Sequence, residues 1–509
     1  MDRLIASIDP VRGARRLAAR RAVELHSRAY DAARRDHRTM SWRTTGASAD
    51  SEIAMSGDIV RDRARDLVRN NGYARKALAT LSDHIIGTGI MVSARGSSAA
   101  HRLRIARAFQ DWSSEADWDG DLDFYGIQKL ALRFMLESGE VLIRLRRQEF
   151  DSRTHVVPLK LQVLEADFID STLNRTLAGG GEIDRGIEYD GLGRKVAYWI
   201  LPVHPGEMTR FVRKREGPSR VPADEIIHLY EKHRPGQARG ISIFAPVIMA
   251  ARDLDQYFEA ELVRKKIEAC LAGFIVSPNQ DFPIDADAGK NPQSGAGRLA
   301  EKFEPGMLMR LREGEDIRIA APAGTSGIAQ FAEVYLREMA CGVGIMYEQL
   351  TGDFSHVNYS SFRAGHHGFR RNVESIQDLN IKPRLLLRIM RRWHEAALAA
   401  GLISNADFVW HFTPPPFLSV DPEKDAKADL ADLRMGKKTL SQIVEGRGVD
   451  YLDHLQQVSD DMAAADAVLP SGSLFDGRPP QTTERAEKCC KRRRRVRRKL
   501  RMRGGLRPL

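Results

Sequence analysis

The sequence has few of the residues that build disulfide frameworks and metal sites. It contains four cysteines in 509 residues and no CxxC or CxxH pair. Cys270 and Cys341 fall within helical patterns, whereas Cys489 and Cys490 are adjacent. Because cysteine often packs as a small hydrophobic residue, we expect buried free thiols in a reducing compartment and no zinc site.

Long hydrophobic segments are also missing. Ala269–Val276 is among the longest apolar runs, and it is far shorter than the roughly 18 to 20 residues that span a bilayer. Near the N-terminus, Asp2, Asp9 and Pro10 stand where a secretory leader would be continuously apolar. The sequence therefore predicts no membrane partner, no export, and assembly in the cytoplasm.

Signatures of nucleotide binding and catalysis are incomplete. The GxGxxA spacing at 295–300 follows a loop instead of a strand, so a loop of an insert is favoured over a dinucleotide site. No GxxxxGK[ST] sequence occurs, and neither Ser242 nor Ser326 completes a GxSxG elbow. We therefore predict no enzyme activity and no cofactor.

Two other groups of residues have the composition of metal ligands. Residues 117–126 alternate carboxylates as a calcium loop does, but Leu122 and Gln128 replace its glycine and its final glutamate. A solvated acidic turn is favoured, with weak divalent binding as the alternative. His366 and His367 are neighbours on a predicted helix and point about 100° apart, so they cannot chelate one ion. His366 lies on the apolar face, which favours a core or interface histidine.

Positive charge is concentrated at the two ends of the chain. The net charge is +11, and residues 485–509 alone hold thirteen Lys or Arg against one Glu, a net of +12. Residues 1–484 therefore sum to 11 − 12, or −1. Residues 1–38 hold ten Arg against five acids, which leaves −6 for residues 39–484. A mildly acidic body thus stands between basic ends.

The C-terminal tail has too few apolar residues to pack, so we expect it to be disordered when alone. Arg-rich runs bind phosphates by counterion release without reading base sequence. Nucleic-acid binding is therefore the favoured role. A solvated tail without a ligand and an altered reading frame after Pro480 are the alternatives. The predicted DNA-binding residues are Lys491, Arg492, Arg493, Arg494, Arg495, Arg497, Arg498, Lys499, Arg501 and Arg503.

The first half of the chain changes from helical to mixed character. Apolar spacing predicts two helices over 53–86, broken near Gly72, and further helices over 101–112 and 125–136. Residues 140–242 then alternate β-branched and aromatic segments, such as VLIRL and LKLQVLE, with turn signals. This pattern indicates a mixed α+β region.

The second half predicts helix, β-containing insert, helix, loop and long helix. The first helix covers 244–271, and the insert holds the strand GFIVS and a hairpin that turns at Gly314. A second helix covers 328–341. From Tyr359 onward apolar residues step by three and four along one helix, in which Pro383 predicts a kink because it lacks a backbone donor.

The segment YEQLTGDFSHVNYSSFRAG, Tyr347–Gly365, is the most informative in the chain. Its glycine, short polar residues and lone Asp and His predict a loop that cannot bury itself, held between two helices. The segment closely resembles the tunnel-loop junction of lambda-family phage portal proteins, the rings at the capsid vertex through which double-stranded DNA is packaged and released. GEVLIRL, RPGQARGIS and FTPPPFLSVDPEKDAKA carry the same resemblance, which covers roughly residues 40–460.

The resemblance implies an α+β fold of portal type, with a mixed wing, two stem helices, a small β-containing clip, a long kinked helix and an α-helical crown region. The basic tail is not part of the family motif. The predicted parts are a basic N-terminal arm, 1–49; the wing, 50–242; stem helix 1, 243–271; the clip, 272–325; stem helix 2, 326–346; the tunnel loop, 347–358; the long kinked wing helix, 359–412; the crown region, 413–468; a linker, 469–484; and the basic tail, 485–509.

The resemblance also implies a homo-oligomeric ring, expected to be dodecameric, located at the virion's portal vertex after assembly in the host cytoplasm. Its implied partners are double-stranded genomic DNA, the terminase large subunit, the major capsid protein and scaffold, and head-tail connector proteins. The alternative is a non-portal DNA- or RNA-binding protein acting through the Arg-rich tail. The tunnel-loop residues expected to approach DNA without gripping it are Asp353, Ser355, His356 and Asn358.

Overall fold

The computed structural model describes most of the chain between residues 44 and 468. The gaps are 97, 152, 154–155, 209–215, 270–272, 277–315, 320–326, 405–406 and 418–420; before residue 44 only 11, 15, 18, 37 and 40–42 are described. The basic tail, the linker, and most of the predicted arm and clip lie outside the described residues. Among the helices that are described, none combines the length and the apolar composition of a membrane span.

Two compact units are distinguished, residues 1–56 with 233–238 and the remainder of the chain. Within the smaller unit, short polar contacts hold the segment 233–238. Arg234 forms an ion pair with Glu52 at 2.8 Å and donates a hydrogen bond to the carbonyl oxygen of Ala47. Asp50 accepts the backbone N–H of Ala238 at 2.7 Å. An ion pair and hydrogen bonds therefore connect residues 47–52, where a long helix starts at Ala49, to residues 234–238.

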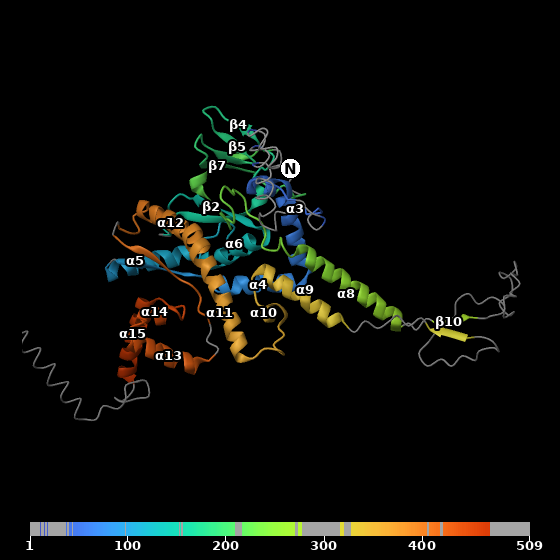
Figure 1. Cartoon of the computed structure of the whole chain (residues 1–509). Helices are drawn as coiled ribbons and strands as arrows, with labels where there is room; N and C mark the ends of the chain where they lie inside the picture. The colour runs from blue at the N-terminus through green and yellow to red at the C-terminus, as the bar shows by residue number, and fades with distance from the viewer. Residues whose placement is uncertain are drawn as a thin grey trace, which may run out of the picture. The chain divides into compact units, whose positions relative to one another are not determined.

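Among the described residues, four helices precede the strand that starts at Glu140 (Figure 1), and a side chain caps the start of three of them. Asn71 separates the first two, and its side chain accepts the N–H of Ala74 at 3.0 Å. Ser98 and Asp123 cap the next two in the same way. The predicted helices and the predicted break are confirmed. The helices are α3 (Ala49–Asn70), α4 (Gly72–Ile85), α5 (Ala99–Ser113) and α6 (Phe124–Ser138).

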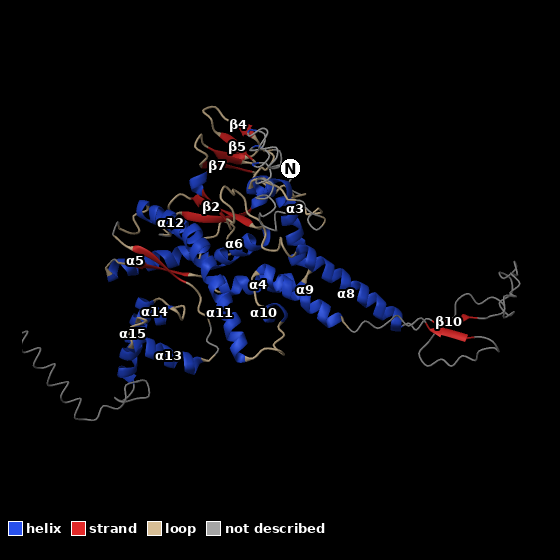
Figure 2. Cartoon of the chain, in the orientation of Figure 1, coloured by secondary structure: helices blue, strands red, loops and turns tan. Residues whose placement is uncertain are grey.

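The mixed region contains two antiparallel sheets, as the alternating segments predict (Figure 2). The first has the order β3-β2-β9, and its central strand is buried over most of its length. The second is a five-stranded meander in chain order. The strands are β2 (Glu140–Arg147), β3 (Leu159–Glu165), β9 (Ile226–Tyr230), β4 (Arg175–Thr176), β5 (Glu182–Asp184), β6 (Ile187–Tyr189), β7 (Lys195–Ile200) and β8 (Ser219–Pro222), with short 3-10 turns η2 (Ala166–Phe168) and η3 (Ala223–Glu225).

Two quoted motifs, GEVLIRL and RPGQARGIS, meet in the interior. Glu140 is fully buried and accepts the side-chain N–H groups of Arg239, with distances of 2.6 to 3.0 Å. It also accepts the backbone N–H of Gly240 at 2.9 Å and lies 2.9 Å from His228. A Cβ on Gly240 would overlap the carbonyl group of Gly139. Glycine at both positions is required for this close approach.

The buried charges compensate each other. Burial opposes ionisation of Glu140, but the charge of Arg239 and the hydrogen bonds from His228 and Arg239 hold the pKa of the carboxyl well below its usual range. Burial lowers the pKa of His228 to about 4, so this imidazole is neutral at pH 7. The site is therefore a single Glu–Arg ion pair supported by a neutral histidine.

The main core joins segments that are distant in sequence. Trp112 and Trp393 are completely buried, with ring centroids 6.3 Å apart. Phe109 and Phe124 pack edge to face at 5.5 Å in the same cluster. Large aromatic residues contribute much of the buried apolar area of a core. The helix that follows the tunnel loop is thereby fixed against the helices that precede the sheets.

The predicted helix, insert, helix order is present. Helix α8 (Ile248–Ala269) packs against α9 (Ile328–Val343), with the rings of Tyr257 and Phe331 4.3 Å apart. In the insert, β10 (Gly273–Val276) pairs with β11 (Asp316–Ile319). Residues 307–315, the first strand and turn of the predicted hairpin, lie outside the described residues.

The hydrogen-bond pattern of the long helix changes around Pro383, but the helix does not end there. Helix α11 (Tyr359–Ile376) continues through a π-helical segment, η4 (Gln377–Leu386), into α12 (Leu387–Ala399). Pro383 lies within this segment, which closes with a bond from the Leu387 N–H to the carbonyl of Lys382, five residues back. A wider helical turn accommodates proline, which has no backbone N–H to donate. Pro383 thus lies in a π-helical segment, and the kink that the sequence predicts there stays a prediction.

The connector and crown region complete the fold. Strand β12 (Val409–Thr413) pairs with β1 (Met91–Arg95), so the start of the Pro-rich segment joins a sheet. In the crown region, Asp450 accepts a hydrogen bond from Ser93 at 2.7 Å. Of the three helices in the predicted crown region, the first and the last expose most of their described residues, as predicted for polar helices, whereas the short middle one buries Val444. They are α13 (Pro422–Arg434), α14 (Leu440–Glu445) and α15 (Tyr451–Val468).

Candidate functional site

The predicted tunnel loop is shorter than its sequence suggests. Stem helix α9 ends at Gly344, whose φ is +82°, and the chain then forms a short helix, α10 (Tyr347–Thr351). Leu350 on α10 is buried, and α10 contacts α4 and α9. The expectation of a loop beginning at Tyr347 is therefore wrong for the first five residues. Sequence analysis missed one buried leucine among polar neighbours, and the loop proper is 352–358.

Three of the four predicted loop residues bond within the loop or to the next helix. Asp353 accepts the backbone N–H of Ser355 at 2.9 Å and its hydroxyl at 2.6 Å. Asn358 caps α11 by accepting the N–H of Ser361 at 2.9 Å, and the Ser361 hydroxyl accepts the N–H of Asn358 in return. The structure shows no hydrogen bond for the side chain of His356 among the described residues. The loop thus fixes its own conformation with its polar groups.

The loop presents no guanidinium or ammonium group. Asp353, Ser355, His356 and Asn358 are all exposed to solvent. Hydrogen bonds from Ser355, and to a smaller extent the charge of His356, lower the pKa of Asp353. The carboxylate is therefore negative at neutral pH, and a phosphate that approached the loop would meet a like charge.

An exposed phenylalanine accompanies these polar residues. Phe354 is 53% exposed, and its ring lies edge to face with that of Phe362 at 5.8 Å. A half-exposed aromatic ring at a loop tip can contact bases or sugars without a charge, or a neighbouring chain. Sequence analysis did not single out Phe354, because it gave weight only to the polar residues around it.

His366 occupies the apolar face of α11, as predicted. Its ring stacks on Phe362 with centroids 5.9 Å apart and meets Phe417 edge to face at 5.8 Å. Burial, together with the nearby charge of His84, lowers the pKa of His366. The interpretation of a packed histidine is confirmed. It anchors the first turns of the helix that follows the loop.

The acidic segment 117–126 forms a turn, as favoured from its sequence. Asp117 is buried and accepts the backbone N–H groups of Asp121 and Leu122 at 3.0 and 3.1 Å. Asp123 caps α6. These two carboxylates stabilise the chain reversal between α5 and α6.

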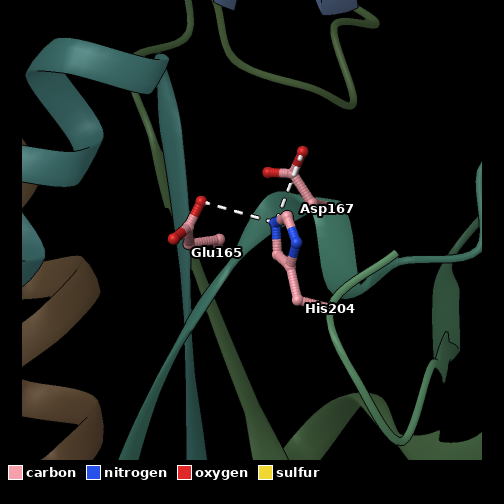
Figure 3. Close-up of side chains that lie close together, drawn as sticks. All are labelled: Glu165, Asp167 and His204. Atoms are coloured by element: carbon pink, nitrogen blue, oxygen red, sulfur yellow. Dashed lines mark ion pairs between the residues drawn. The ribbon is translucent and has the colours of Figure 1, made fainter. Parts of the chain in front are cut away.

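A second acidic cluster has the composition of a metal site. Glu165, Asp167 and His204 bring one ligand atom each to within 4.8 Å of one another (Figure 3). His204 Nε2 lies 3.7 Å from Glu165 and 3.9 Å from Asp167. These distances are too long for direct hydrogen bonds.

Two arginines already neutralise these carboxylates. Arg65 lies 2.6 Å from Glu165 and 2.7 Å from Asp167, and Arg61 lies 3.2 Å from Asp167. Burial opposes ionisation of Asp167, but Arg65 and Arg61 outweigh it and lower the pKa of the carboxyl. A divalent cation here would be repelled by two guanidinium groups, so the cluster is an ion-pair network that joins α3 to the sheet.

One cysteine departs from the prediction. Cys341 is a free thiol, but it is exposed on α9, so the expectation of a buried residue is wrong at this position. The neighbouring positions Met339, Ala340 and Val343 take the buried face of the helix instead. Cys270, Cys489 and Cys490 lie outside the described residues, as do the predicted DNA-binding residues of the tail.

Comparisons with known proteins agree with this arrangement. The family described as "Phage portal protein, lambda family" matches residues 35–377. A "Probable portal protein" of Halomonas phage phiHAP-1 is 29% identical over 460 residues, covering 86% of each chain. "Portal protein B" of Escherichia phage lambda is 23% identical over 500 residues, covering 87% of this chain and 92% of its own.

Solved structures were also found. A chain in "Neck of native GTA particle computed with C12 symmetry" is 15% identical with a TM-score of 0.43, covering 77% of this chain and 99% of its own. An HK97 family phage portal protein from Corynebacterium diphtheriae is 11% identical with a TM-score of 0.33, covering 72% and 96%. The family match spans more than half of the sequence and includes α8, α9, the loop 352–358 and α11. The chain belongs to the lambda family of phage portal proteins.

Proposed function

We propose that copies of this chain, about twelve by the family resemblance, close into a ring at the capsid vertex and that double-stranded DNA passes through its centre. Heterologous contacts close into a ring when the rotation between subunits is right. The observation that carries the conduit role is the loop 352–358, which is largely exposed, forms hydrogen bonds within itself and to the next helix, and contains no Lys or Arg.

A conduit must not bind its cargo tightly. An arginine at the constriction would attract each phosphate that passed, because such contacts release counterions and are strong at low salt. Asp353 carries the opposite charge, and Ser355 and Asn358 use their hydrogen-bonding groups within the chain. The loop therefore offers DNA a surface of low adhesion.

The remaining roles rest on family membership. The clip, 272–325, is the proposed docking surface for the terminase motor and later for head-tail connectors. The wing, 50–242, is the proposed contact for the major capsid protein and scaffold. The basic tail would meet packaged DNA on the interior side of the capsid. A simple DNA- or RNA-binding protein would explain the tail but leave the stem helices and the loop without a purpose.

The conduit role predicts the effect of adding charge to the loop. Asp353→Arg combined with His356→Arg adds about three positive charges per subunit at neutral pH, so packaging should be slowed by about tenfold at low salt and less at high salt. The measurement is the packaging rate of assembled particles carrying the variant ring.

The control places the same charge elsewhere. Gln457→Arg with Asp461→Arg changes the charge equally at two exposed positions of α15, in a region to which no partner is assigned. These particles should package at the normal rate. Normal packaging by the loop variant, or equal slowing by both variants, would contradict the proposed role of the loop.

A further inference from the structure

Helix α11 has two faces of opposite character. Phe369 and Val373 are buried against the rest of the chain. On the other side Arg363, His367 and Arg371 are exposed. Residues four apart lie above one another on a helix, so these three form one row of basic side chains. The row starts one turn after Asn358, the residue that ends the tunnel loop.

The charge of this row is only partly compensated within the chain. Arg363 approaches Asp425 only at 3.4 Å, and both side chains are more than 40% exposed. Among the residues that the structure describes, neither His367 nor Arg371 has an ion-pair partner. The adjacent Arg370 differs, because it is bonded to Glu374 at 2.8 Å. A structural role within the chain therefore accounts for Arg370 but not for the row itself.

A hollow of about 390 Å³ lies beside the row. It is lined by His367, Gly368, Arg370, Arg371 and Glu374. A Cβ placed on Gly368 would meet no atom within 4 Å, so the backbone of the helix is open to solvent at that point. A polyanion can approach the helix closely here, beside His367 and Arg371.

The spacing of the row suits a nucleic-acid strand. Each step of four residues rises about 6 Å along a helix. Every second phosphate along one strand of duplex rises about 6.8 Å. Arginine is well suited to phosphate, because its planar fork can donate two hydrogen bonds. A carboxylate-rich protein surface would also attract the row but would have no reason to match this repeat.

We propose that Arg363, His367 and Arg371 form a phosphate-contacting row for double-stranded DNA, adjacent to but set back from the tunnel loop. This inference rests on the proposed function, since it requires that the loop lines the passage. The row guides the duplex through a few weak, salt-sensitive contacts per subunit, whereas the loop itself repels phosphate. The two surfaces together would centre DNA without holding it.

The test uses assembled rings that lack residues 485–509, because the tail would otherwise dominate binding of a short duplex. Arg363→Glu with Arg371→Glu should weaken duplex binding on the order of 10- to 100-fold at 0.1 M salt and flatten the salt dependence, because about two phosphate contacts are lost per engaged subunit. Arg363→Lys with Arg371→Lys should keep most of the affinity, since a lysine still neutralises a phosphate. The matched control is Arg391→Glu with Arg434→Glu, two exposed arginines outside the row, which should bind the duplex nearly normally.

Three results would overturn the inference. Intact Glu-variant rings with normal affinity and salt dependence would show that the row does not contact DNA. Equal weakening in the control would show only a general charge effect. Loss of rings in the Glu variant, with intact control rings, would assign the row to a contact between subunits. Failure of the unaltered chain to form any ring would instead contradict the proposed function.

Discussion

Replacing Arg239 with methionine is expected to lower the free energy of unfolding by about 3 to 5 kcal/mol, the usual cost of leaving one member of a buried ion pair unpaired. The carboxylate of Glu140 would then have only His228 and the N–H of Gly240 as partners. In the native chain burial lowers the pKa of His228 to about 4, so the guanidinium of Arg239 is the positive charge that the variant removes. Urea unfolding followed by tryptophan fluorescence measures the loss, because Trp112 and Trp393 are in the core.

Two further variants separate charge from packing. Adding Glu140→Gln to Arg239→Met should recover part of the lost stability, because no buried charge then remains and the glutamine still accepts the N–H of Gly240. Lys427→Ala breaks an exposed pair with Glu423 and should change stability little. If the double variant loses the sum of the two single losses, the ion pair does not hold these motifs together.

Deleting residues 485–509 is expected to abolish most DNA retention at low salt while leaving ring formation intact. The tail carries a net +12, so about twelve copies would present on the order of 144 charges, comparable to the phosphates on roughly 245 Å of duplex. Retention by the full-length ring should fall by a factor of about 10³ to 10⁵ between 50 and 200 mM salt if six to ten phosphates are contacted. Filter binding across a salt series measures both effects.

A variant of the tail itself serves as the control. Val496→Ser, Leu500→Ser and Met502→Ser replace the three apolar residues within the basic run 491–503 and keep every charge. This variant should retain DNA as the full-length chain does. Unchanged retention by the truncated chain, or loss in the serine variant, would refute a purely electrostatic tail.

The sequence was most informative where local rules and packing agree. Asn71, Ser98 and Asp123 cap helices at the positions that the pattern indicates, and Pro383 disturbs the long helix where it stands. The form of that disturbance depends on tertiary packing. Ile381 and Leu385 are buried within η4, so the segment remains helical and widens its turn instead of breaking.

Long-range pairings were beyond sequence reasoning. The ion pair between Glu140 and Arg239 joins residues 99 positions apart, and neither residue type indicates its partner. A charge next to a strongly apolar strand, as in GEVLIRL, was the available signal. For the loop, its location and exposed residues were predictable. The helix α10 was not, because it depends on burial of Leu350 against distant helices.

Imaging of the purified full-length protein by negative-stain electron microscopy tests the central claim most directly. The account predicts closed rings with a central opening wide enough for a DNA duplex. Compact monomers or dimers under every assembly condition would contradict it.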